Sequence, residues 1–311
     1  MAALFLSDAL RRRIDRMPSL RRGRYALEAG ALATFWQIAS WLPPQAASNI
    51  GRRLLSLVGP GLVKSKHVER NLRLAFPNLE ERQRRDLARE VWGTAGAVLA
   101  ELPHLKAICE RTFDEPFQTG VNIDLDAYRS GRKYAVFVTA HLANWELGAA
   151  AAPHLGVPLS VVHATSKNPY VERILRRRRA DLGFQLVSRE DGARPLLREL
   201  GAGRSVAMVI DARDDEGVPL PFFGLDKLTT IAPARLALRF GCDLVPIRVE
   251  RLEGVWFRVT ICDPIRPDAR VTSEKVRAIG MMGEVNRLFE QWIRERPQEW
   301  VCIKRAFPKR A

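Results

Sequence analysis

A histidine and a glutamate five residues apart are the residues of this sequence best suited to proton-transfer chemistry. The string reads A-H-L-A-N-W-E, and of five histidines only His141 stands directly after an apolar run that predicts a buried strand and also five residues ahead of a carboxylate. With His141 in a loop and Glu146 in the first turn of a helix, the carboxylate can fold back to the imidazole. That contact would hold one ring nitrogen and leave the other as a general base. A structural histidine is the alternative interpretation.

Four consecutive arginines, Arg176 to Arg179, lie on the helical stretch that follows His163. Arg179 lies one turn from Arg176 and can face a cleft, where a guanidinium binds a phosphate or a developing oxyanion. The other three are candidate docking charges for an acidic donor. A solvated helix face is the alternative interpretation of the run.

An acidic cluster follows the apolar run 205–210 and contains one arginine, Arg213. Asp211 stands at the end of the predicted strand, so it is the carboxylate of this cluster that we expect at a site. The other acidic residues are interpreted as loop solvation.

Two shorter strings complete the set of candidates. Asn144 is placed to cap a helix that starts at Trp145. Phe222 and Phe223 lie in a P-F-F-G string that predicts a turn, where they would form either a lid of the core or a wall for an acyl chain.

The spacing of the remaining residues excludes several classes of enzyme. H-E-x-x-H is absent, and His154 and His163 lie on separate elements, so no metal site is predicted. There is no G-x-S-x-G nucleophile elbow and no glycine-rich phosphate loop. The four cysteines form no C-x-x-C pair. We therefore expect no metal and no cofactor, and a base-catalysed transfer without a covalent intermediate.

An α/β fold is expected to position these residues. Six short apolar runs after about Asp124 predict buried strands, and helical stretches separate most of them, so the pattern favours a mostly parallel central sheet flanked by helices. The strands are predicted at 134–140, 158–163, 184–188, 205–210, 243–249 and 255–261. In such sheets ligands bind beyond the carboxyl ends of the strands, where His141 and Asp211 would lie.

The chain divides into three predicted parts. Residues 1–42 form a basic, apolar membrane-associating segment, residues 43–123 a helical N-terminal region, and residues 124–311 the α/β catalytic domain. The first part has seven arginines in 24 residues and then an apolar stretch of 18 residues, which is short for a membrane span of about 20. A monotopic or barely spanning anchor with Trp36 and Trp41 at the headgroups is one interpretation, and a buried helix is the other.

The net charge of the protein limits the classes of partner that it is expected to bind. With 50 basic and 35 acidic residues the formal net charge is +15, which attracts nucleic acid, an anionic membrane surface or an acidic substrate. Nucleic acid is disfavoured, because there are only four tyrosines and no aromatic residues are interleaved with the arginines as stacking platforms require.

Taken together, several of these strings resemble the late lipid A biosynthesis acyltransferases of Gram-negative bacteria, which are akin to mycobacterial phosphatidylinositol mannoside acyltransferases. The resemblance covers most of the chain. The matching residues, in order along the chain, are Arg70–Leu72, Ala75–Pro77, His141–Glu146, Asn168–Pro169, Arg179, Gly183, Asp211, Pro221–Gly224, Ala232, Ala234 and Pro297–Trp300.

The resemblance implies transfer of an acyl chain from acyl carrier protein to a hydroxyl of a lipid A precursor, at the cytoplasmic face of the inner membrane. It implies His141 and Glu146 as the catalytic pair. Substrate-binding roles are expected for the residues Asn144, Arg179, Asp211, Arg213, Phe222 and Phe223. Ala212 departs from the family, which has a glutamine there. Two alternatives stay open: the same chemistry on a phospholipid, aminolipid or other glycolipid, and a non-catalytic basic membrane-binding protein.

Overall fold

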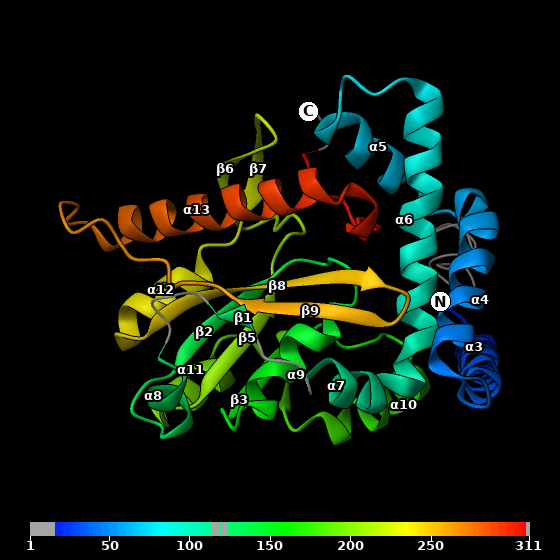
Figure 1. Cartoon of the computed structure of the whole chain (residues 1–311), viewed down its shortest axis with the longest axis horizontal. Helices are drawn as coiled ribbons and strands as arrows, with labels where there is room; N and C mark the ends of the chain where they lie inside the picture. Colours follow the sequence, from blue (N-terminus) through cyan, green and yellow to red (C-terminus); the bar gives the residue numbers. More distant parts are fainter. Residues whose placement is uncertain (1–15, 114–117, 120–123, 309–311) are drawn as a thin grey trace.

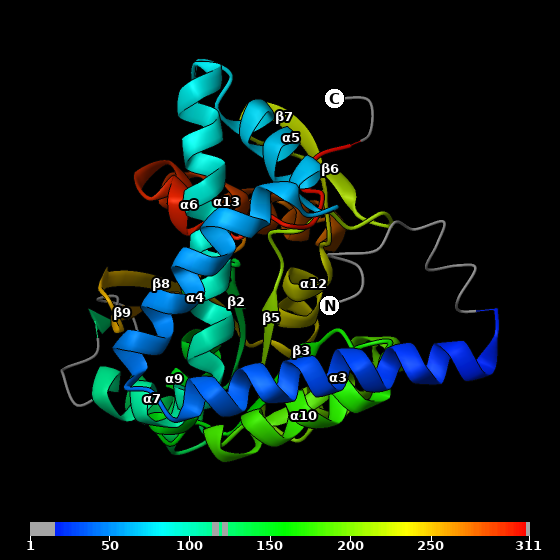
Figure 2. The same cartoon turned by 90° about the vertical axis from the view of Figure 1, so that its right-hand side faces the viewer.

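The fold is α/β, as the sequence predicts. A computed structural model describes residues 16–113, 118–119 and 124–308. A mostly parallel sheet lies at the centre between two layers of helices, and the helices of the N-terminal region stand at one end of it (Figure 1). Figure 2 shows α3, α4 and α6 side by side on this end of the molecule.

The central sheet has the strand order β1-β9-β8-β2-β5-β3-β4. Within it β8 and β9 pair antiparallel and the other neighbours pair parallel. Its strands are β1 (Gln118–Thr119), β2 (Ala135–Thr139), β3 (Leu159–His163), β4 (Gln185–Ser188), β5 (Ser205–Val209), β8 (Asp243–Glu253) and β9 (Trp256–Ile261). All six apolar runs that predict strands therefore form strands.

Successive side chains of the central strand β2 enter two different cores, because side chains of a strand alternate between its faces. Val136 and Val138 belong to the core that the C-terminal helices cover. Ala135 and Phe137 belong to the core on the opposite face of the sheet. The strand is buried along its whole length, which fixes its position and that of the loop after it.

Helices cover both faces of this sheet. On one face lie α12 (Ala232–Phe240) and α13 (Glu274–Glu295), together with α11 (Arg194–Gly201). On the other lie α7 (Leu105–Phe113), α9 (Glu146–His154) and α10 (Pro169–Arg179). The short helix α8 (Leu125–Arg129) precedes β2.

A two-stranded hairpin that the sequence did not indicate follows β5. It consists of β6 (Val218–Phe222) and β7 (Leu225–Thr229), which pair antiparallel. Phe223 and Gly224 form its turn with φ of 55° and 73°, the left-handed conformation that a two-residue hairpin turn of type I′ requires at both positions. The predicted turn is thus correct at these two residues, whereas Phe222 belongs to a strand.

The N-terminal region is helical, as predicted. Residues 43–123 contain α4 (Pro44–Val58), α5 (Ser65–Ala75), α6 (Glu81–Glu101) and α7, although the strand β1 also falls within them, and α3 (Pro18–Ser40) precedes them. Gly51 of α4 and Gly96 of α6 lie where their helices cross, and a side chain at either would collide with the backbone of the other. The two glycines therefore let α4 and α6 pack at close range.

Helix α3, which contains most of the apolar N-terminal stretch, has both buried and exposed apolar side chains. It therefore has features of a buried helix and of a membrane-associating one. Trp36 is fully buried and its Nε1 donates to the carbonyl of Leu99 at 2.8 Å, so its expected position at lipid headgroups is wrong. Trp41 and Leu27 instead leave about three quarters of their surface exposed. Within the described residues, none of the helices has the length and apolarity that crossing a bilayer demands. Residues 1–15 of the predicted membrane segment lie outside the described residues.

Candidate active site

His141 and Asp211 meet at the carboxyl edge of the central sheet. Strands β2 and β5 are parallel neighbours with Thr139 opposite Val209, and each of the two residues follows its strand by two positions. The side chains are therefore brought together by strand pairing, with His141 Nδ1 at 2.6 Å from Asp211 Oδ1. This contact is where the geometry differs most from expectation, because Glu146 was expected to hold the imidazole.

Asp211 is a buried, ionised carboxylate. It is 3% exposed, and Trp300 Nε1 donates to its Oδ2 at 2.9 Å. Burial alone would raise its pKa, but the attraction of His141 and the hydrogen bonds from His141 and Trp300 outweigh burial and hold the pKa well below its ordinary value. An ionised carboxylate only accepts, so Nδ1 of His141 is the donor and a neutral imidazole carries its lone pair on Nε2.

A buried lysine stands behind this carboxylate. Lys227 of β7 is fully buried, and its Nζ donates to the main-chain carbonyl of Asp211 at 3.2 Å and lies 4.3 Å from the ring centre of Phe222. Burial lowers the pKa of Lys227 to about 8, because desolvation disfavours the ammonium more than Asp211 favours it. The protonated lysine therefore supplies a positive charge next to Asp211 without reaching its carboxylate.

The imidazole opens onto a small cavity of about 210 Å³. His141, Trp145, Asp211 and Ala212 form one side of it, and the segment from Trp300 to Lys304 with Ala306 forms the other. Trp145 meets the imidazole ring edge-on at 5.0 Å. Among the described residues nothing hydrogen-bonds to Nε2 of His141, so this nitrogen is available to a molecule in the cavity.

The far wall of the cavity is held by α5. The main chain of this segment pairs with the loop of His141, since Val301 N donates to the His141 carbonyl at 2.9 Å. Asn71 then binds three of its backbone groups: its Nδ2 donates to the carbonyls of Cys302 and Lys304, and its Oδ1 accepts from Ala306 N. One buried asparagine thus shapes the cavity wall, which accounts for the R-N-L string noted in the sequence.

Glu146 and Arg179 pair with each other. Arg179 Nε donates to Glu146 Oε2 at 2.9 Å, and its Nη2 makes a second, short contact with Oε1. Burial disfavours the charge on Arg179, but the attraction of Glu146 and its hydrogen bonds outweigh burial and raise the pKa of the guanidinium. The expected hydrogen bond from Glu146 to His141 is therefore wrong, and the pair instead joins α9 to α10.

Asn144 does not cap the helix that follows it. Its Nδ2 donates to Glu101 Oε2 at 2.9 Å, in a buried network where Glu101 also binds Ser48 and Arg251. Trp145 is the residue before the first helical residue, and it has no capping side-chain bond. Asn144 ties the loop of His141 to α6 and α4, and it lies below the cavity lining rather than in it.

Three other predicted substrate-binding residues lie outside the cavity lining. Arg213 pairs with Asp215 at 2.6 Å, and its Nε and Nη1 are buried without a partner among the described atoms. Phe222 and Phe223 are buried and pack against Trp300, with ring centres 6.1 Å away in both cases. In this structure they support Trp300 from below, as part of the core.

Sequence reasoning missed Lys227, Asn71 and the cavity-lining role of Trp300. Asn71 and Trp300 both lie in strings that carry the family resemblance, which was the available signal. Lys227 gave none, because a lysine in an alternating strand is ordinarily taken as facing solvent. Among the described residues no cluster of His, Cys, Asp and Glu side chains has the arrangement of a metal site.

Comparison with known proteins shows the family of the chain. No curated protein sequence matches the chain. A family described as bacterial lipid A biosynthesis acyltransferase matches residues 14–309, which is nearly the whole chain. The protein with the His141–Asp211 pair therefore belongs to the bacterial lipid A biosynthesis acyltransferase family.

Proposed function

We propose that this acyltransferase moves a fatty acyl chain from an acyl carrier protein thioester to a hydroxyl of a lipid A precursor. The observation that carries the proposal is the His141–Asp211 pair, with one imidazole nitrogen bound and the other open to a cavity. Family membership supports acyl transfer to a lipid.

The reaction needs a base, because a neutral hydroxyl is a poor nucleophile. His141 Nε2 takes the hydroxyl proton while the oxygen attacks the thioester carbonyl, and Asp211 stabilises the imidazolium that forms. The tetrahedral intermediate then collapses, breaks its carbon–sulfur bond and expels the thiolate. The imidazolium returns the proton to the sulfur, so His141 ends the cycle neutral.

Glu146 and Arg179 have a positioning role in this mechanism. Arg179 was expected to stabilise the oxyanion, but it is held by Glu146 and does not line the cavity. The pair fixes the start of α9 directly after the His141 loop. We therefore propose backbone N–H groups near Trp145, which lines the cavity, as the donors to the oxyanion.

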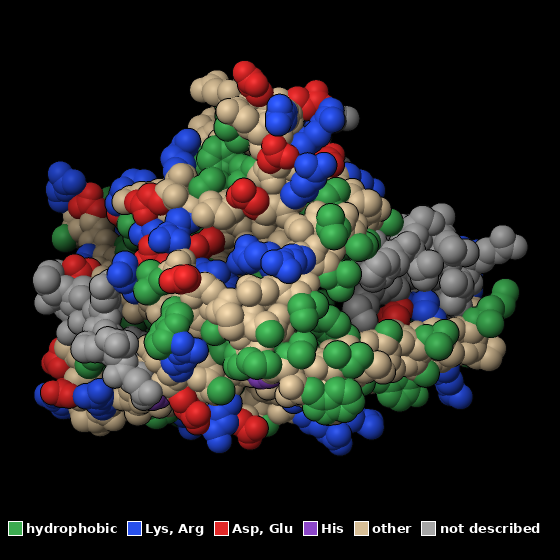
Figure 3. All heavy atoms as spheres, turned by 45° about the vertical axis from the view of Figure 1, so that its right-hand side comes forward, with side chains coloured by type: hydrophobic (Ala, Val, Ile, Leu, Met, Phe, Trp, Pro, Cys, Tyr) green, Lys and Arg blue, Asp and Glu red, His purple; other side chains and the backbone are tan. Residues whose placement is uncertain are grey.

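Attachment to an anionic membrane at the cytoplasmic face is part of the proposal. Exposed apolar side chains gather on α3 and α4, where Figure 3 shows a band of them along the face that includes α3. The largest exposed ones are Leu20, Leu27, Ile38, Trp41, Ile50, Leu54, Leu57 and Val58. Arg21 and Arg22 are exposed on α3 as well. Apolar burial plus basic charge supports binding in the interface of an anionic bilayer.

The donor is tested by a direct comparison of two thioesters. Purified protein is incubated with the lipid acceptor and with either acyl carrier protein or coenzyme A that carries the same acyl chain. The acylated lipid product is then quantified by mass spectrometry. A marked preference for the carrier protein, falling with salt, is expected because the protein is strongly basic. Equal use of both donors would contradict the donor assignment, and no product from either would contradict the function.

The acceptor is tested by the mass of the lipid made in cells. Total lipid A from cells with and without the protein should differ by one acyl chain. An unchanged lipid A together with an altered phospholipid or aminolipid would favour the alternative acceptor.

A further inference from the structure

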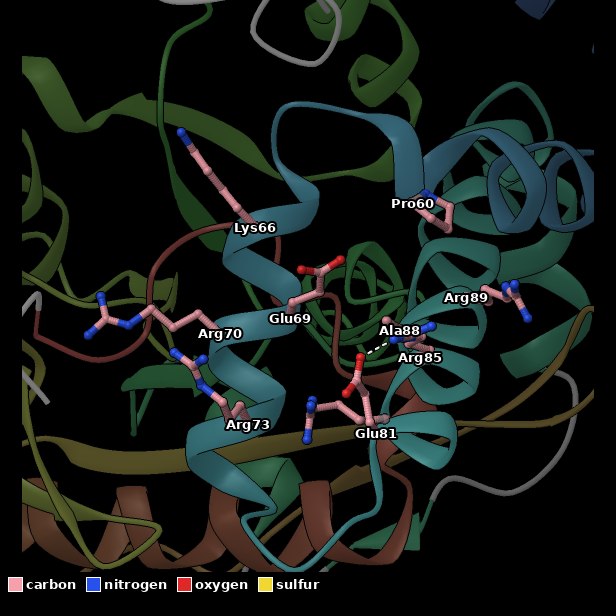
Figure 4. Close-up of a pocket in the computed structure, with 10 residues that line it drawn as sticks. Pro60, Lys66, Glu69, Arg70, Arg73, Glu81, Arg85, Ala88 and Arg89 are labelled. Atoms are coloured by element: carbon pink, nitrogen blue, oxygen red, sulfur yellow. Dashed lines mark hydrogen bonds and ion pairs between the residues drawn. The ribbon is translucent and has the colours of Figure 1, made fainter.

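A second cavity, of about 320 Å³, opens between α5 and the first half of α6 (Figure 4). Its lining has six basic side chains and two carboxylates, Glu69 and Glu81. The basic ones are Lys66, Arg70, Arg73, Arg84, Arg85 and Arg89. Such a surplus of positive charge in a concave surface is suited to an anion with several oxygens.

Part of this charge is not neutralised inside the protein. Glu81 pairs with Arg85, and Arg89 pairs with Asp86 outside the cavity. In the described part of the chain no carboxylate pairs with Lys66 or Arg73, which are both exposed on α5. Figure 4 shows Lys66, Arg70 and Arg73 in one row along α5, with Glu81 and Arg85 on the facing helix. A bound phosphate would supply the missing negative charge.

Helix α5 separates this basic pocket from the candidate active site. Lys66, Arg70 and Arg73 project from one side of the helix, and the buried Asn71 projects from another, toward the wall of the His141 cavity. An α-helix is about 10 Å across, and the two cavities lie on different sides of this one helix. The thickness of the helix between them is comparable to the size of a lipid headgroup. They are separate sites, since no residue lines both.

An exposed apolar row leads to the basic pocket. Ile50, Leu54, Leu57 and Val58 follow helical spacing on α4, and Leu57 is 81% exposed. The row ends two residues before Pro60, which lines the pocket. A free phosphate would contact only the basic side chains of the pocket. An acidic protein could bind the same basic side chains without the apolar row of α4. A lipid with a phosphate in its headgroup would use both.

We propose that the pocket between α5 and α6 binds the phosphate of an anionic lipid headgroup, with the acyl chains of that lipid along the apolar row of α4. This deepens the proposed membrane attachment and rests on it. The pocket would give the attachment a specific point of contact, in addition to the diffuse attraction of a +15 protein.

The test is a vesicle-binding assay with two matched double variants of the full chain. Lys66→Gln/Arg73→Gln removes two charges of the pocket. Arg194→Gln/Lys275→Gln removes two exposed charges from α11 and from the start of α13, at the other end of the molecule (Figure 1). Sedimentation is measured with vesicles of phosphatidylcholine alone and of phosphatidylcholine with phosphatidylglycerol.

The pocket variant should lose about 30-fold in affinity for the anionic vesicles, since two basic contacts at the surface are lost, while the control should change by less than about twofold. Both should bind neutral vesicles as the wild type does. Equal losses in the two variants would overturn the pocket, and absence of binding to either vesicle by the wild type would overturn the attachment itself.

Two further measurements separate the lipid from other anions. A short-chain phosphatidylglycerol should raise the melting temperature of the wild type more than inorganic phosphate does at equal ionic strength, and the pocket variant should lose the difference. An equal effect of inorganic phosphate would overturn the assignment to a lipid. The assignment to a lipid would also be overturned if the pocket variant kept its affinity for vesicles and had a higher KM for acyl carrier protein. If the double variant fails to fold by circular dichroism, the single variants take its place.

Discussion

Two histidines lie at the carboxyl ends of strands of the same sheet, and both contact a carboxylate, but of the two only His141 lines the cavity described above. His163, the last residue of β3, contacts Glu172 through Nε2 at 2.9 Å and the Val187 carbonyl through Nδ1 at 3.1 Å. His141 contacts Asp211 through Nδ1 alone, and its side chain is 20% exposed. A histidine with both nitrogens bound has no free nitrogen for a substrate, so the second partner separates a structural pair from one that can act as a base.

The carboxylates of the two pairs differ in the same way. Glu172 also binds Ser166 N and Arg176, so its charge is shared among groups that join α10 to the loop before it. Asp211 is held by Trp300, which lines the cavity, and by the buried Lys227 beneath it. The partners of Asp211 therefore orient one imidazole toward the cavity, whereas those of Glu172 hold a helix in place.

Removing the imidazole of His141 should have the largest effect. His141→Ala is expected to lower kcat by about 10⁴-fold, the upper end of what a general base contributes, because His141 is the one imidazole among the residues that line the cavity. Turnover of the acyl thioester by the purified variant measures this. Near-normal turnover would remove His141 from the mechanism.

Neutralising the carboxylate should have the next largest effect. Asp211→Asn is expected to lower kcat by about 10²-fold, since an amide cannot stabilise the imidazolium and can offer Nδ1 an N–H. The double variant with His141→Ala should be no slower than His141→Ala alone, because the two residues act as one unit. Additive losses in this cycle would show that Asp211 works apart from His141.

Glu146→Gln tests whether Glu146 acts in catalysis, as Asp211 does, or only holds helices in place, as Glu172 does. The substitution keeps one acceptor oxygen but leaves the partly buried Arg179 without its ion-pair partner, which should lower the free energy of unfolding by about 1–3 kcal/mol. Urea titration measures that change, and turnover is then compared at a temperature where the variant is folded. A strong loss of kcat in folded protein with no change in stability would return Glu146 to direct catalysis.

The charge of Lys227 predicts a pH dependence of stability. Its pKa is about 8 in the folded protein against 10.5 for an ordinary lysine, so the unfolded chain binds more protons between these values. The free energy of unfolding of the wild type, relative to Lys227→Met, should therefore rise by about 3 kcal/mol from pH 8 to pH 10.5 and stay level below pH 8. A flat difference over this range would mean that the pKa of Lys227 is not lowered in the folded protein, and a rise that continued below pH 8 would mean that the buried lysine is uncharged.

His163→Gln should have the smallest effect on catalysis. The variant keeps a polar side chain between Glu172 and the Val187 carbonyl, so kcat is expected to change by less than about twofold while the melting temperature falls by a few degrees. Steady-state kinetics and thermal unfolding measure the two quantities. A large loss of kcat in the folded variant would erase the distinction between the two histidines.

The sequence predicts the sheet well and the site only in part. Apolar runs mark β2 and β5 because buried parallel strands are apolar throughout. His141 and Asp211 could each be placed at the end of a strand, but 70 residues separate them, and their contact depends on a strand order that no local pattern contains. Glu146 is the carboxylate nearer to His141 in the sequence, so local spacing favours it over Asp211.

Local rules also hide the hairpin and its lysine. Pro219 and Pro221 argue against a strand at β6, yet both prolines point outward on a two-stranded hairpin where one edge needs no partner. On β7 Lys227 has the position of a buried residue and the chemistry of an exposed one. Burial of such a charge becomes intelligible only once Asp211 is known to lie beside it.

The segment from Trp300 to Ala306, which forms a wall of the cavity, is synthesised after the other residues of the site. The ribosome makes β2, β5 and both members of the His141–Asp211 pair long before it makes Trp300, which binds the carboxylate, and before the backbone that Asn71 holds. A nascent chain therefore has its base without the wall beside it, open to water. The cavity beside His141 is therefore complete only after the segment from Trp300 to Ala306 has been made and has packed against it.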